Sequence, residues 1–406
     1  MKKKNSLAIT DAEFAGFGTY KYSAIDDSPL SIYVMHPFWD WCVQFMPKTW
    51  APNTITLLGF CHSILQVVLL AIYDPNFQES KKDTIPRWVW FVCAFAQFMA
   101  HTLDGIDGKQ ARRLKKGSAL GELFDHGVDA WTCCIILMSV FSAIGVGYDT
   151  ETPQLNPIDM FITVWALQSS FFMSQLEKFG TGTLYLPWAY DASMVGLAGF
   201  YLVCGSIGTS FLHNSWVILG IRVFVYLSIP GLTVPMFYKI YKIKTSDDEA
   251  IRNKRSWKEI WLGFQPLLLA VILTFVWFFF SKETTNYRVV CFLCGALFAN
   301  MTCRLIISQM SEQAPRPEHY WNILLVFCFI GLVLEVFVKF GLEKFVDYDG
   351  FASVSLWIWL IIAVVINLMH VIYCGDVIVN LSRHLNIYPF SVTDRPDIEM
   401  ETDSLV

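Results

Sequence analysis

Long apolar stretches separated by short polar connections recur along the chain from residue 53 onward. A bilayer core needs about 20 apolar residues per helix, and ten stretches approach that length. We expect them near residues 53–73, 88–103, 129–147, 158–176, 192–208, 215–238, 259–280, 289–309, 321–341 and 353–374. The pattern therefore predicts an all-α, polytopic membrane helix bundle with about ten transmembrane helices.

An aromatic-rich segment, residues 29–50, precedes the first of these spans and is interrupted by polar residues. Aromatic side chains are enriched where a membrane meets water, so we expect an N-terminal interfacial helix. A helix packed against the bundle is the alternative. Residues 1–28 then form a polar N-terminal segment without a signal-peptide core. Residues 29–390 form the membrane domain, and residues 391–406 an acidic tail that is expected to be disordered and cytosolic.

Basic residues in the connections set the expected orientation. Lysines and arginines gather at residues 109–116 and 239–258, whereas residues 148–157 and 209–214 contain none. Because cytoplasmic connections are rich in lysine and arginine, both basic regions are expected to face the cytosol. An even number of spans would place both termini on that side.

The composition agrees with a membrane protein and excludes some kinds of partner. The chain is 54% hydrophobic and 16% charged, whereas soluble domains carry about 25% charged residues. The net charge of −5 is inconsistent with a nucleic-acid partner. The 11 cysteines form neither a disulfide framework nor a paired zinc motif. Cys291 and Cys294 form one CxxC, which we interpret as helix packing because it lies in an apolar run.

Two pairs of aspartates stand at the polar ends of the second and third predicted spans. Asp104 and Asp107 are three residues apart, and Asp125 and Asp129 are four apart. Residues at these spacings share one face of a helix. The connection between the pairs lets the two helices run antiparallel. We therefore expect the four carboxylates to converge on one cytosol-facing cavity.

Four carboxylates at membrane depth repel one another and are usually functional. Oxygen ligands suit Mg²⁺ or Mn²⁺, and four carboxylates fit a site for two metal ions that act on a phosphoryl centre. The sequence therefore predicts two Mg²⁺ ions, which Mn²⁺ can replace.

Glycines and basic residues surround the aspartates. Glycine lets a phosphate or nucleotide approach the backbone, and Lys109 and Arg112 can pair with phosphate oxygens. The glycines are Gly105, Gly108, Gly121 and Gly127. The alternative is a solvated loop whose acids and bases pair with one another.

Residues 104–129 read D-x2-D-G-x2-A-R-x8-G-x3-D-x3-D. This spacing resembles the signature of the CDP-alcohol phosphatidyltransferase family at every fixed position. From about residue 20 to residue 390 the chain is similar to the eukaryotic choline/ethanolamine phosphotransferase branch. The matching segments are residues 20–23, 36–39, 52–56, 108–113 and 121–127. Residues 104–107 and 184–191 look more like the members that are dedicated ethanolaminephosphotransferases.

The resemblance implies a reaction with two substrates. Phosphoethanolamine would pass from CDP-ethanolamine to the 3-hydroxyl of diacylglycerol or alkyl-acylglycerol, giving phosphatidylethanolamine and CMP. A choline or dual choline/ethanolamine phosphotransferase is the alternative. It also implies a homodimer in the endoplasmic reticulum or Golgi membrane, with the active site facing the cytosol.

The resemblance also implies roles for individual residues. Asp104 and Asp125 would bridge both metals, while Asp107 would favour one ion and Asp129 the other. The nucleotide and phosphates would meet a further group of residues: Asn53, Gly108, Lys109, Ala111, Arg112 and Gly121.

The lipid hydroxyl needs a general base. His126 is the first candidate, because imidazole titrates near neutral pH, and the resemblance points to it as well. Asp129 is the second candidate, and a packing or second-shell role for His126 is the alternative.

Three polar residues at helix ends stay open to two interpretations. Asn53 either caps the first span or contacts the nucleotide, as the resemblance implies. Glu177 and Asp191 either meet a cationic head group or have ordinary helix-end positions, and the second interpretation is favoured.

A divalent-cation transporter is a competing class of protein. Transporters place acidic residues on several distant or repeated helices. Here all four aspartates lie on one pair of helices beside phosphate-type residues, which favours an enzyme.

Overall fold

The structure is a computed structural model that describes residues 6–148, 151–247, 255–281, 286–316, 326, 329–334, 336–337, 348–393 and 395. The ninth expected span, residues 321–341, lies mostly outside the described residues. Most of the expected C-terminal tail and part of the basic region 239–258 also lie outside them.

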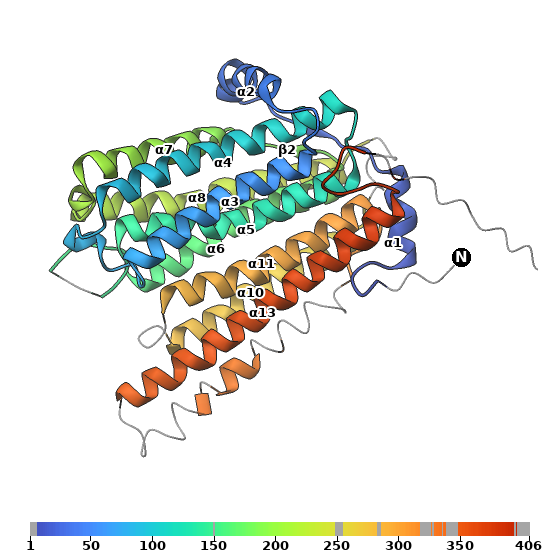
Figure 1. Cartoon of the computed structure of the whole chain (residues 1–406). Coiled ribbons are helices and arrows are strands. Elements are labelled where there is room, and N and C mark those ends of the chain that lie inside the picture. The colour runs from blue at the N-terminus through green and yellow to red at the C-terminus, as the bar shows by residue number, and fades with distance from the viewer. Residues whose placement is uncertain are drawn as a thin grey trace, which may run out of the picture.

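Eleven described helices account for nearly all of the regular structure. They are α1 (Asp11–Gly16), α2 (His36–Cys42), α3 (Pro52–Tyr73), α4 (Arg87–Leu114), α5 (Ala119–Ile144), α6 (Pro157–Thr181), α7 (Ala189–Ile207), α8 (Ser215–Lys244), α10 (Trp257–Ser281), α11 (Tyr287–Met310) and α13 (Tyr348–His384). The longer helices lie side by side as tilted rods (Figure 1). Short 3₁₀ or π turns are η1 (Phe17–Thr19), η2 (Ser31–Met35), η3 (Val43–Phe45), η4 (Ser80–Lys82) and η5 (Ser210–Leu212).

Eight of the described helices are long and apolar enough to cross a membrane: α3, α4, α5, α7, α8, α10, α11 and α13. Each coincides with an expected span, so the all-α polytopic membrane fold is confirmed. Helix α6 coincides with the expected span at 158–176 but is less apolar than these eight. Its polar residues, such as Gln168 and Gln175, are buried, because α5, α8, α10 and α11 pack around it.

The boundary between α4 and α5 differs from the sequence expectation. The expected spans ended at residue 103 and began at residue 129, which left the aspartates at helix ends. In the structure α4 continues to Leu114 and α5 begins at Ala119. The turn uses Lys115 in the left-handed region, and the Ser118 hydroxyl caps α5 by accepting from the Gly121 N–H at 3.1 Å. The expected long connection is therefore wrong.

Contacts with the preceding segment explain why α4 continues beyond the apolar run. The Gln110 amide donates to the carbonyls of Pro47 and Trp50 at 3.0 and 3.2 Å. The Arg113 guanidinium donates to the carbonyls of Val43 and Met46 at 2.7 and 3.0 Å. These hydrogen bonds to another segment stabilise the last two turns of α4. Hydropathy alone does not reveal them.

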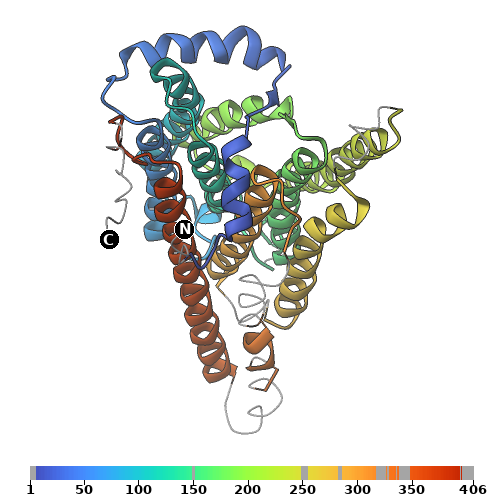
Figure 2. The ribbon, with the colours of Figure 1, turned by 90° about the vertical axis from the view of Figure 1, so that its right-hand side faces the viewer.

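The helical run from η2 through α2 to η3 lies across one end of the bundle, crosswise to the long helices (Figure 2). Its inner face buries Met35, Trp39 and Val43 against α3 and α4. Its outer face exposes Tyr33 and Trp41. The run therefore has the aromatic outer face of an interfacial helix, and it also packs on the bundle.

The N-terminal segment reaches the same end of the bundle. Strand β1 (Ala24–Ile25) pairs in parallel with β2 (Leu184–Tyr185), which lies between α6 and α7. Helix α1 packs against α11 through Phe14 and neighbouring apolar residues. Residues that precede the first span are thereby brought beside the loop between α6 and α7.

Candidate active site

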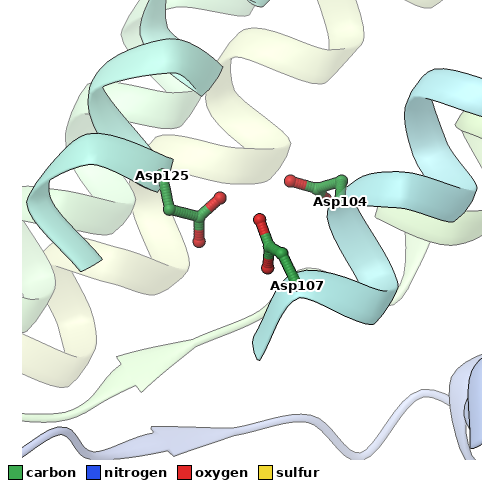
Figure 3. Close-up of side chains that lie close together, drawn as sticks. All are labelled: Asp104, Asp107 and Asp125. Carbon is green, nitrogen blue, oxygen red and sulfur yellow. The ribbon is translucent and has the colours of Figure 1, made fainter. Parts of the chain in front are cut away.

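Three of the expected carboxylates form one acidic cluster. Asp104 and Asp107 extend from α4, and Asp125 extends from α5. Each offers one oxygen atom, and these oxygens all lie within 4.8 Å of one another. Figure 3 shows the three side chains directed at a common point between the two helices. The shared-face spacing therefore brings these residues together, and we call them the acidic cluster.

Asp129 lies one helical turn further along α5. It lines a cavity adjoining the cluster, together with Asp104. This inner cavity is small, with a volume of about 30 Å³, and residues of α3, α4, α5 and α7 surround it. The structure thus groups three of the four aspartates and places the fourth on the wall beside them.

The donor set of the cluster fits a divalent cation. Among the described residues, no lysine or arginine forms an ion pair with any of the four aspartates. The Oδ1 atom of Asp125 is buried and has no hydrogen-bond partner in the described part of the chain. Close carboxylates without a counter-charge are unfavourable, and oxygen donors are the ligands that Mg²⁺ and Mn²⁺ prefer.

Neutral hydroxyl groups orient two of the carboxylates. The Thr56 hydroxyl of α3 donates to Asp107, and the Tyr190 hydroxyl of α7 donates to Asp104 Oδ2 at 3.1 Å. Groups of this kind fix the direction of ligands without joining them. Sequence reasoning missed both roles, although both residues lie within the segments that carry the family resemblance.

The residues expected to meet phosphates have different surroundings. Lys109 Nζ lies 2.7 Å from Asp40 Oδ1 of α2, so this lysine is held toward the interfacial run. Arg112 is exposed, and its Nη1 would lie 3.7 Å from a β-carbon at Gly108. Ala111 is partly buried beside it. Arg112 is therefore the nearer basic group for a ligand that approaches Gly108.

Asn53 does not cap α3. The N-cap residue is Ala51, and Asn53 is the second residue of the helix, so the capping interpretation is wrong. Asn53 is buried, and its Oδ1 would lie 3.4 Å from a β-carbon at Gly121. The two residues expected to meet the nucleotide thus face each other across α3 and α5.

His126 is buried on α5 and contacts a charged network. Its Nδ1 lies 3.9 Å from Glu122 Oε1, one turn away, and it has no hydrogen-bond partner within the described ranges. The Lys178 ammonium donates to Glu122, and the Tyr20 hydroxyl lies 2.7 Å from both carboxylate oxygens. The carboxylate beside His126 is thereby fixed from two sides.

Burial and the Glu122 charge raise the pKa of the Tyr20 hydroxyl far above its ordinary value. Tyr20 therefore keeps its proton and acts as the donor to Glu122. Sequence reasoning missed Tyr20, Glu122 and Lys178. The four-residue spacing of Glu122 and His126 was the available signal.

The glycines of the motif divide into two groups. Gly108 and Gly121 face polar space near Arg112 and Asn53. A β-carbon at Gly105 would instead lie 2.1 Å from the Trp39 ring, and one at Gly127 would lie 3.2 Å from Cys303 Sγ. Gly105 and Gly127 therefore permit close packing, and the expectation that they adjoin a phosphate is wrong.

Gly105→Ala is expected to lower the thermal unfolding midpoint of the detergent-solubilised protein. Displacing Trp39 costs about 1–3 kcal/mol, as overpacking does, which outweighs a helix-propensity gain of about 1 kcal/mol. Gly108→Ala is the matched control, since its β-carbon would find 3.7 Å of room. An unchanged midpoint for Gly105→Ala would show that the packing of Trp39 on α4 does not require this glycine.

Fold and site together define a polytopic membrane protein with an acidic cluster at one end of its bundle. Residues 49–227 match the family model described as CDP-alcohol phosphatidyltransferase. The chain is 35% identical to Ethanolaminephosphotransferase 1 of Mus musculus and of Homo sapiens, over 95% of this chain and 94% of each relative. It is 27% identical to Choline/ethanolaminephosphotransferase 1 of Saccharomyces cerevisiae, over 95% of this chain and 97% of the relative.

The chain belongs to the CDP-alcohol phosphatidyltransferase family. The expected family and enzyme class are confirmed, and the transporter interpretation is set aside.

Proposed function

We propose that this protein is a Mg²⁺-dependent ethanolaminephosphotransferase. It transfers phosphoethanolamine from CDP-ethanolamine to the 3-hydroxyl of diacylglycerol or alkyl-acylglycerol. The convergence of Asp104, Asp107 and Asp125 carries the proposal, because these carboxylates have no basic partner among the described residues. The similarity to ethanolaminephosphotransferases over nearly the full length supports the head group.

Two Mg²⁺ ions, which Mn²⁺ can replace, would be held by Asp104, Asp107, Asp125 and Asp129. When bound, they neutralise a diphosphate and stabilise the charge that develops during phosphoryl transfer. Thr56 and Tyr190 keep two of these carboxylates in position.

In this proposal the nucleotide and the inner cavity lie on opposite sides of the acidic cluster. Gly108, Ala111 and Arg112 line the phosphates, and Asn53 and Gly121 face the cytidine. Lys109 contributes positive charge nearby, although its ammonium is paired with Asp40.

His126 is the proposed general base. It takes the proton of the lipid hydroxyl as the new bond forms between that oxygen and the phosphorus that bears ethanolamine. The bond from this phosphorus to the CMP oxygen breaks, and CMP leaves with the electron pair. Glu122, held by Tyr20 and Lys178, is placed to stabilise the charged imidazole.

An apolar groove supports diacylglycerol as the acceptor. It has a volume of about 470 Å³, and residues of α3, α5, α11 and α13 line it. Phe60 and Val128 line both this groove and the inner cavity, so the groove adjoins the cavity wall beside Asp129. Acyl chains in this groove would bring the glycerol hydroxyl toward the four aspartates.

The compartment and orientation are also part of the proposal. The basic turn after α4 supports a cytosolic position for the acidic cluster by the positive-inside rule. Residence in the endoplasmic reticulum or Golgi and assembly as a homodimer follow from the family resemblance and stay predictions.

Competition between CDP-ethanolamine and CDP-choline tests the head group. With purified protein, Mg²⁺ and diacylglycerol, both donors are supplied at equal concentration with different isotopic labels. We expect phosphatidylethanolamine to exceed phosphatidylcholine at least about tenfold, as a site built for a hydrogen-bonding group rejects one that lacks it. A kcat/KM ratio that favours CDP-choline would support the choline alternative, and absence of CMP release from both donors would refute the proposed reaction.

A further inference from the structure

Several polar side chains line the inner cavity, although it lies within a bundle of membrane-spanning helices. It adjoins the acidic cluster through Asp104 and Asp129, and it extends along α4 past His101 to Gln97. Helices α3 and α7 contribute Ser63 and Tyr190 to its wall. Buried polar side chains without partners at this depth require a polar occupant or water.

His101 is the least satisfied polar side chain of the cavity wall. Its side chain is 1% exposed. Neither ring nitrogen has a hydrogen-bond partner among the residues that the structure describes. The imidazole is held by ring contacts, with centroids 5.3 Å from Trp39 and 5.8 Å from Tyr190. A buried ring nitrogen without a partner is unfavourable unless a ligand supplies one.

Asp191 is the carboxylate that lies beside Nε2 of His101. Its Oδ1 lies 3.4 Å from His101 Nε2, and its side chain is 4% exposed. The Ser31 hydroxyl of η2 donates to the other carboxylate oxygen. The carboxylate favours the tautomer with hydrogen on Nε2. The free Nδ1 then has a lone pair and acts as an acceptor.

The direction of the substrate follows from the proposed function. If the diphosphate lies at the acidic cluster and cytidine lies beside Asn53 and Gly121, the alcohol end points to the other side of the cluster. The inner cavity occupies that side, since Asp104 belongs to both. Its volume of about 30 Å³ admits about two or three water-sized groups, which the two-carbon ammonium chain of ethanolamine matches.

We propose that the inner cavity binds the alcohol end of the substrate and that His101, oriented by Asp191, selects a primary ammonium group. The ammonium of ethanolamine donates a hydrogen bond to His101 Nδ1, and the Tyr190 ring lies beside it. A trimethylammonium group has no N–H, so it would leave Nδ1 buried without a partner. His101 is thus a specificity-determining residue, and Asp191 is a positioning residue. This inference rests on the proposed function.

A methylation series of donors tests the inference. CDP-ethanolamine, its N-monomethyl and N,N-dimethyl derivatives and CDP-choline are compared by kcat/KM. The wild-type protein should lose efficiency with each methyl group. His101→Phe keeps an aromatic ring but removes the acceptor. We expect kcat/KM for CDP-ethanolamine to fall about 10–100-fold, with CDP-choline changed less than about threefold.

Two further variants separate selection from folding. Asp191→Asn presents an amide N–H toward His101 Nε2, which favours a proton on Nδ1 and opposes the ammonium. It should reduce the differences in kcat/KM among the four donors, as is expected of His101→Phe. It also provides the test if His101→Phe fails to fold. His62→Phe is the matched control, because His62 lies outside the cavity and its Nδ1 contacts the Leu58 carbonyl at 2.8 Å. It should keep the wild-type ratio.

The outcomes distinguish this inference from the proposed function. A wild-type ratio of donor efficiencies in both cavity variants would overturn the role of His101, as would an equal loss on all four donors. A wild-type protein that releases no CMP from any donor would refute the proposed reaction instead. Thermal-shift affinities for the four donors would then still test the cavity, and equal affinities would count against it.

Discussion

Asp125→Asn is expected to lower kcat by about 10³-fold or more. The carboxylate of Asp125 is the only contribution of α5 to the three-residue acidic cluster formed by the described residues. An amide is isosteric with it but carries no charge, so the site loses one of the charges that would hold a divalent cation. Loss of a preorganised charge at a phosphoryl centre has effects of this size.

The measurement is CMP release by purified Asp125→Asn protein over a range of Mg²⁺ concentrations. Asp11→Asn, an exposed change in α1, is the matched control and should leave the rate unchanged. Chelation with EDTA should abolish wild-type activity, and Mg²⁺ or Mn²⁺ should restore it. Substantial turnover in EDTA, or a near-normal rate for Asp125→Asn, would contradict the metal site.

His126→Ala is expected to keep affinity for the CDP-alcohol while kcat falls about 10²–10⁴-fold, the range for loss of a general base. The imidazole does not belong to the acidic cluster, so cation and nucleotide binding should persist. Successive residues on a helix point about 100° apart, which directs His126 away from Asp125. It faces Glu122 instead, at 3.9 Å.

Asp129→Asn provides the contrast, and calorimetry and turnover kinetics distinguish the two variants. Asp129 lies beside Asp104 on the cavity wall, so its loss should change the Mg²⁺ requirement as well as the rate. Suppose instead that His126→Ala turns over at the wild-type rate while Asp129→Asn loses rate at an unchanged Mg²⁺ requirement. Asp129 is then the base, and the assignment to His126 is wrong.

The acidic cluster could be predicted because its information is local. The spacing of Asp104 and Asp107 needs only a helix to produce a shared face, and the apolar runs on either side supply that helix. The same reasoning failed at the ends of α4 and α5. Hydropathy marks where lipid contact stops, whereas the helix continues as long as Gln110 and Arg113 find carbonyl partners in another segment.

Long-range pairs account for the residues that sequence reasoning missed. Tyr20 meets Glu122 across 102 residues, and Lys178 reaches the same carboxylate across 56. No periodicity connects such positions. Gly105 illustrates the same limit, because its sequence context suggested a ligand whereas its actual neighbour is Trp39.

The parallel pairing of β1 with β2 has a practical consequence for shortened versions of this protein. A boundary at residue 29, drawn from hydropathy, keeps every described membrane span and the whole acidic cluster. It also discards Tyr20 and its hydrogen bonds to Glu122, together with the strand that fixes the segment beside the loop between α6 and α7. Truncations and chimaeras that treat the first 28 residues as a dispensable leader would therefore alter the surroundings of the proposed base and remove the packing of α1 on α11, although they keep every described membrane span.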